Sequence, residues 1–70
     1  MKVNTSVEFG RVIKDKRKAL GYTQGYVSEV TGLSASFISN LENGKATAEL
    51  DKAIQLANVL GLSVFIESRS

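Results

Sequence analysis

The 70-residue sequence contains no cysteine, no histidine and no proline. Neither a disulfide nor a zinc site is therefore expected to stabilise the fold, although a chain of this length is near the lower limit for a single hydrophobic core. We expect side-chain packing, and contact with a second chain, to supply the stability. No cysteine or histidine is present as a nucleophile or base, and the seven acidic residues form no close pair suited to acid–base catalysis. The sequence predicts a protein that is not an enzyme, with no catalytic residue, metal or cofactor.

Long apolar runs are also absent. No stretch approaches the roughly 20 consecutive apolar residues of a membrane span, and the first residues lack the pattern of a secretion signal. We expect a soluble, cytoplasmic protein with no membrane partner.

Positive charge is missing from the middle of the chain, since residues 19–44 contain no lysine or arginine. The first 18 residues, in contrast, carry six basic side chains and only two acidic ones. A basic segment of this kind is attracted to a phosphate backbone. A solvated helix surface explains the same charges, so the net charge of +2 supports nucleic-acid binding without establishing it.

Helix signals cover most of the first sixty residues. The spacing of Thr5 and Glu8 is that of a capping box and predicts the start of a first helix, which Gly21 ends. Thr23 is the expected cap of a short second helix through about Thr31. The expected inner residues of the first helix are Phe9, Val12, Ile13 and Leu20.

Residues 24–42 have the pattern of a helix-turn-helix, in which a tight turn joins two short helices. Gly32 suits the left-handed backbone at which the second helix must end, and Leu33 fills the gap that follows. Ser34 is a good N-cap for a third helix, which is expected to end near Asn43. Such a motif places its last helix in the major groove, so the sequence predicts DNA binding. The expected inward-facing residues are Val27, Leu33, Ile38 and Leu41.

A last amphipathic helix follows a loop. Its apolar residues recur at the spacing of one helix face, and Gly61 closes it. Thr47 or Glu49 is expected to cap its start. The sequence thus predicts an all-α, compact cluster of four helices, or five if the loop adds a turn, over residues 1–61. The expected buried residues of the last helix are Leu50, Ala53, Ile54, Ala57 and Leu60.

Residues 62–70 have the pattern of a strand rather than of a helix. Leu62, Val64 and Ile66 alternate on one face and predict a single β-strand. A lone strand leaves its backbone N–H and C=O groups unpaired, and the simplest donor of a partner strand is a second copy of the chain. We expect a two-fold homodimer. Its dimerisation strand is defined by Leu62, Val64, Phe65 and Ile66. The alternative is an apolar tail that packs on the last helix.

From Phe9 to Lys45 the sequence resembles the phage-repressor-like (XRE) family of helix-turn-helix domains. The shared residues are Phe-Gly-x-x-Ile, Thr-Gln, Gly-Leu-Ser and Ile-Ser-x-Leu-Glu-Asn-Gly-Lys. The loop Ala-Thr-Ala-x-Leu-Asp and the terminal Leu-Gly-Leu-Ser-Val-Phe-Ile-Glu are similar to the HipB-like branch. Proteins of that branch are antitoxins and autoregulators, paired with HipA-type kinase toxins, that dimerise through a C-terminal strand. The resemblance implies a lambda-repressor-like DNA-binding domain.

The resemblance also implies roles for residues on and around the third helix. The residues that would face the DNA bases are Ser34, Ala35, Ser36, Ser39 and Asn40. The residues that would hold the phosphate backbone are Thr23, Gln24, Asn43 and Lys45. Ordinary solvated surface is the alternative for Ser39 and Asn40. The third helix has no lysine or arginine to contact guanine, so specificity would come from few contacts, from water and from DNA shape.

Two further expectations follow from the family pattern. Arg17 and Glu42 would form a structural ion pair that ties the first helix to the end of the third. The alternative is that Arg17 contacts a phosphate. Thr31 stands where the family has an apolar residue, and we expect Val30 to compensate.

Together these observations predict a sequence-specific transcriptional repressor that binds a two-fold operator in double-stranded DNA as a homodimer. The resemblance favours a HipB-like antitoxin and autoregulator of a type II toxin–antitoxin module, with a HipA-type kinase toxin as its partner. The alternative is a stand-alone repressor, of phage or chromosomal origin, without a toxin partner.

Overall fold

The computed structural model describes residues 2–45 and 48–69 of the chain. This part of the chain contains four helices, which are α1 (Ser6–Ala19), α2 (Gln24–Thr31), α3 (Ala35–Glu42) and α4 (Leu50–Val59). The described residues contain no strand. The predicted all-α cluster of four helices is confirmed. Within the described residues, no helix is long and apolar enough to cross a membrane.

Side chains cap the first three helices, as the sequence predicts. Thr5, Thr23 and Ser34 each accept a hydrogen bond from the backbone N–H three residues further on, at 3.0–3.1 Å. These bonds satisfy N–H groups that have no partner inside the helix. α4 follows Glu49, whose side chain makes no capping bond within the described residues. The other expected cap, Thr47, lies outside the described residues.

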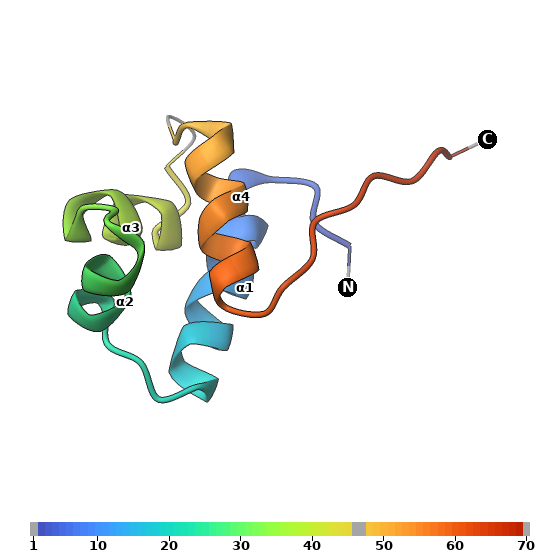
Figure 1. Ribbon diagram of the computed structural model, residues 1–70. Helices are drawn as coiled ribbons and strands as arrows, with labels where there is room; N and C mark the ends of the chain where they lie inside the picture. Colours follow the sequence, from blue (N-terminus) through green and yellow to red (C-terminus); the bar gives the residue numbers. More distant parts are fainter. Residues whose placement is uncertain (1, 46–47, 70) are drawn as a thin grey trace.

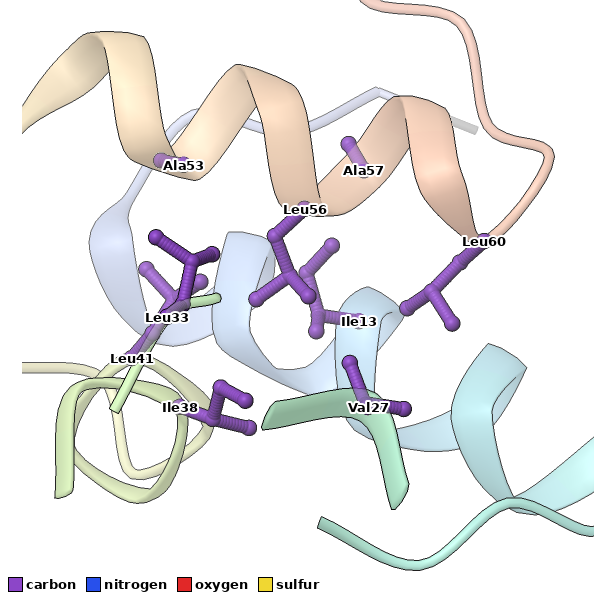
Figure 2. Packing of buried hydrophobic residues seen from close by; sticks show 9 residues of the cluster. All are labelled: Ile13, Val27, Leu33, Ile38, Leu41, Ala53, Leu56, Ala57 and Leu60. Carbon is purple, nitrogen blue, oxygen red and sulfur yellow. The ribbon is translucent and has the colours of Figure 1, made fainter. Parts of the chain in front are cut away.

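The hydrophobic core lies between α4 and the other three helices (Figure 2). Ile13 of α1, Val27 of α2 and Ile38 of α3 are at most 1% exposed. Leu56 of α4 and Leu60, the C-cap of α4, point toward them and are equally buried. Each buried side chain of this size contributes about 1.5–3 kcal/mol, so the cluster fixes how the helices lie against one another. The core is completed by Leu33, Leu41, Ala53 and Ala57.

Two leucines that the sequence pattern places in the core are exposed, so that prediction is wrong for them. Leu20 is 41% exposed because it is the C-cap of α1, where the chain turns away. Leu50 is 72% exposed because it begins α4, one turn before the buried face starts at Ala53. Leu56, absent from the predicted set, is fully buried, and Ile54 lies at the edge of the buried face.

α1 crosses α3 at Gly10. A β-carbon on Gly10 would clash with the backbone carbonyl oxygen of Leu41 and would lie 3.0 Å from that of Glu42. The two helices therefore approach more closely than any residue with a side chain allows. Nearby, the Ser6 hydroxyl donates to the carbonyl of Gly44 at 2.9 Å, which ties the start of α1 to the turn after α3.

The C-terminal segment leaves the helices on the side away from α2 and α3 (Figure 1). Leu62 packs partly against the core, whereas Phe65 and Ile66 are 73% and 98% exposed. These two side chains do not pack on α4, as a docked tail would require. Pairing of the dimerisation strand with a second copy stays a prediction.

Candidate nucleic-acid interface

The turn between α2 and α3 is held by hydrogen bonds. α2 ends at Gly32, whose φ of +78° is left-handed and whose N–H donates to the carbonyl of Ser28 at 2.9 Å. The Ser28 hydroxyl in turn donates to the carbonyl of Leu33 at 2.5 Å. Because Leu33 is also buried beneath the turn, the two helices are fixed as one unit.

Thr31 takes part in the same turn. Its hydroxyl donates to the carbonyl of Val27 at 2.7 Å and accepts from the N–H of Leu33 at 3.1 Å. Val30 is 57% exposed. The expectation that Val30 compensates for Thr31 is therefore wrong. Thr31 itself, rather than Val30, is partly buried, and its hydroxyl is satisfied by hydrogen bonds within the turn.

The residues predicted to face the DNA bases lie at the start and along one side of α3. Ser34, Ala35 and Ser36 are exposed, and Ser39 and Asn40 are partly buried. The Ser34 oxygen accepts the capping bond of α3. All five side chains are uncharged, so this surface offers hydroxyl groups, one amide and one methyl group.

The residues predicted to hold phosphate lie at the ends of α2 and α3. Thr23 is the N-cap of α2, Asn43 is the C-cap of α3, and Lys45 follows the next turn; all three are exposed. Gln24 is partly buried, and its Nε2 donates to Glu42 Oε1 at 3.0 Å. Sequence reasoning missed this contact, because the two residues are 18 positions apart and share no local pattern.

Arg17 and Glu42 form a buried, bidentate ion pair. Arg17 Nε donates to Glu42 Oε2 at 2.6 Å, and Arg17 Nη2 donates to Glu42 Oε1 at 2.9 Å. The third guanidinium nitrogen, Nη1, donates to the carbonyl of Tyr22 at 2.8 Å. The two residues are 8% and 7% exposed. The geometry agrees with the structural ion pair and leaves Arg17 directed at protein groups rather than at solvent.

This network controls the ionisation of Glu42. Burial acts to raise the pKa of the carboxyl group, but the hydrogen bonds from Arg17 and Gln24 outweigh burial and hold the pKa below its ordinary value of 4.5. The hydrogen bond to Glu42 raises the pKa of Arg17. Both groups are charged at neutral pH. Glu42 thus joins α1 and α2 to the last turn of α3 through charged hydrogen bonds.

A family model described as helix-turn-helix matches residues 13–65, which include α2, the turn and α3. The protein belongs to the helix-turn-helix family. A helix-turn-helix protein of this XRE type is a DNA-binding transcriptional regulator, and such proteins are not typically enzymes.

Known helix-turn-helix proteins match almost the whole chain. It is 32% identical over 65 residues to the uncharacterised HTH-type transcriptional regulator y4mF of Sinorhizobium fredii, a match that covers 93% of this chain and 86% of that protein. Among solved structures, a HipB–O4 20mer complex matches with a TM-score of 0.89 and 23% identity over 100% of this chain and 99% of that one. A HipA–HipB–O2–O3 complex matches with the same TM-score, identity and coverage. These structures show that the fold is shared.

Proposed function

We propose that this regulator binds a two-fold operator as a homodimer and represses transcription, acting as a HipB-like antitoxin that also regulates its own operon. The observation that supports the proposal is the likeness of the fold, over the full chain, to HipB in a complex with a 20mer. In such an arrangement the two copies of α3 enter major grooves one helical turn, or a multiple of one turn, apart.

The outer face of α3 supplies the base contacts in this proposal. The amide of Asn40 has the donor and acceptor needed to pair with the edge of adenine, and the methyl group of Ala35 suits the methyl group of thymine. Serine hydroxyls contact any base edge or a bridging water. Because α3 has no lysine or arginine, these contacts are few, and DNA shape contributes the remaining specificity.

Residues at the helix ends position the domain on the phosphates. Thr23 and Gln24 lie at the N-terminus of α2, where free N–H groups and the helix dipole favour an anion. Asn43 and Lys45 follow the last turn of α3, whose final residue, Glu42, accepts the hydrogen bond from Gln24. Phosphate contacts from the two groups of residues fix the depth and register of α3 in the groove.

Dimerisation makes weak half-site contacts sufficient. Once one domain is bound, its linked partner binds at a high effective concentration. The C-terminal segment, which carries the exposed Phe65 and Ile66, leaves the helices on the side away from α3 (Figure 1), so two copies can pair there while both recognition helices stay accessible. Strand pairing would also satisfy the backbone groups of the dimerisation strand.

The toxin partner is a separate element of the proposal, beyond DNA binding. A HipA-type kinase is supported by the match to HipB in its complex with HipA and DNA. The second candidate is a stand-alone regulator without a toxin. It is favoured by the relative from Sinorhizobium fredii, which has the higher sequence identity and is named only as a transcriptional regulator.

A mobility-shift assay with the DNA upstream of the protein's own gene tests operator binding. We expect a complex with two chains per operator that an excess of mixed-sequence duplex does not displace. Coexpression with a HipA-type kinase encoded beside the gene tests the antitoxin role. Restored growth and copurification of the kinase support that role, whereas continued toxicity in the presence of dimeric, operator-binding protein supports the stand-alone regulator.

A further inference from the structure

The helix-turn-helix of this protein has almost no positive charge with which to bind DNA. Neutralisation of phosphates by lysine and arginine supplies essentially all non-specific affinity for DNA and a large share of specific affinity. Residues 19–44 contain neither residue type, and Arg17 is paired with Glu42. Lys45 is the only cation among the residues proposed to hold phosphate. The attraction must therefore come from cations elsewhere.

α1 carries three such cations on one face, which we call the basic stripe: Arg11, Lys14 and Lys18. Their spacing of three and four residues makes them neighbours along the helix. Arg11 and Lys18 are exposed, and Lys14 is partly buried. Across residues 2–45 and 48–69, none of the three forms an ion pair. Like charges at this spacing weaken a helix, and no ion pair among the described residues offsets their repulsion.

The contacts of α1 place one end of the basic stripe beside the last turn of α3. Val7 lies one turn before Arg11 and is in close contact with Gly44. A β-carbon on Gly44 would be only 2.9 Å from Val7 Cα. Gly10, one turn before Lys14, is the point where α1 meets the α3 backbone. The positive charge of Lys14 also helps to lower the pKa of the neighbouring Glu42 carboxyl.

The other end of the stripe approaches the start of α2. Lys18 is in the last turn of α1, next to Arg17, whose guanidinium bonds to the carbonyl of Tyr22. Tyr22 directly precedes Thr23, the N-cap of α2. The stripe therefore runs between the two groups of residues proposed to hold phosphate, at the start of α2 and after α3.

We propose that the basic stripe of α1 is a further phosphate-binding surface, which contacts the DNA backbone beside the groove that α3 occupies. The inference rests on the proposed mode of DNA binding. Ammonium and guanidinium groups donate to phosphate oxygens whatever the base sequence, so the stripe adds affinity rather than specificity. With it, the phosphate contacts form one band from Lys45 along α1 to Thr23.

Salt-dependent binding of single-charge variants tests the stripe. Lys14→Gln and Lys18→Gln each remove one charge from the stripe. Lys16→Gln is the control: it removes the same charge from a position two residues from each of them, about 200° around the helix. Each protein is titrated by fluorescence anisotropy, at several salt concentrations, against a mixed-sequence duplex and against the DNA upstream of its gene. Circular dichroism establishes that every variant is folded.

We expect the stripe variants and the control variant to differ in the affinity and salt dependence of DNA binding. Each stripe substitution should weaken binding to both duplexes roughly five- to tenfold at 0.1 M salt and lower the slope of log affinity against log salt by about 0.9 per chain. Lys16→Gln should leave the slope unchanged. Equal effects for all three variants would mean that net charge alone acts, and would overturn the inference. Failure of the unaltered protein to bind either duplex would instead overturn the proposed function.

Discussion

The amide of Gln24 donates to the carboxylate of Glu42 across 3.0 Å, which joins the first residue of α2 to the last residue of α3. The same carboxylate binds Arg17 of α1. One acidic side chain thus fixes both ends of the helix-turn-helix relative to α1. The buried charge of Glu42 is satisfied only while Arg17 and Gln24 remain.

Arg17→Met should destabilise the protein by about 3–5 kcal/mol, because it leaves the carboxylate of Glu42 buried without its cation. A loss of that size approaches the whole stability of a domain this small. The double variant Arg17→Met/Glu42→Leu replaces the pair by apolar groups of similar volume and should recover most of the loss. Urea denaturation measures both. A double variant no more stable than the single one would contradict this account of the pair.

Acid should weaken the fold through Glu42. Its pKa is below 4.5 in the folded chain, so the unfolded state binds the proton more readily. The stabilisation is therefore complete above about pH 4.5 and is lost as the pH falls through the folded-state value. The difference in unfolding free energy between the natural chain and Arg17→Met/Glu42→Leu should shift in favour of the variant below pH 4.5. A difference independent of pH would contradict the prediction.

Gly10→Ala should destabilise the protein by about 1–3 kcal/mol, because the new methyl group meets the backbone of α3, which cannot move aside without disturbing the core. Gly25→Ala is the matched control, since the nearest atom to a β-carbon there is Thr23 Oγ1 at 3.9 Å. That variant should be as stable as the natural chain, or more stable by about 0.5–1 kcal/mol, through its gain in helix propensity. Thermal unfolding followed by circular dichroism compares the two.

Asn40→Ala should weaken operator binding by about 1–3 kcal/mol, the usual worth of a good base contact, while binding to mixed-sequence DNA stays nearly constant. Anisotropy titrations with both duplexes measure the two losses. Equal losses would make Asn40 a phosphate contact instead.

Removal of residues 62–70 should convert the dimer to a monomer, because it removes the dimerisation strand with its exposed Phe65 and Ile66. Removal of residues 68–70 alone should leave the dimer intact. Sedimentation velocity distinguishes the two states. A monomeric full-length chain would refute dimerisation through this strand.

Local rules predicted the helix boundaries because the signals are local. Thr5, Thr23 and Ser34 cap helices through bonds that span three residues, and Gly32 ends α2 through its own backbone preference. Such features depend on neighbours in the sequence and do not require knowledge of the packed structure.

Features that depend on packing were predicted less well. Leu50 and Leu56 are both apolar and both lie on α4, and only the position of the other helices decides that the second is buried. The close approach at Gly10 and the bond from Gln24 to Glu42 join residues from different helices and leave no periodic signal. The ion pair of Arg17 and Glu42 was expected from the family resemblance, since the spacing of the two residues carries no local pattern.

The uncharged outer face of α3 has a consequence for how the regulator selects its site. In the proposed complex, the cations that respond to salt lie outside α3 and contact every DNA sequence alike, whereas Ser36 and Asn40 contribute only neutral contacts. A rise in ionic strength therefore lowers the affinity for the operator and for bulk DNA in the same proportion. The ratio of the two affinities, which sets how much of the regulator is lost to the rest of the genome, stays constant.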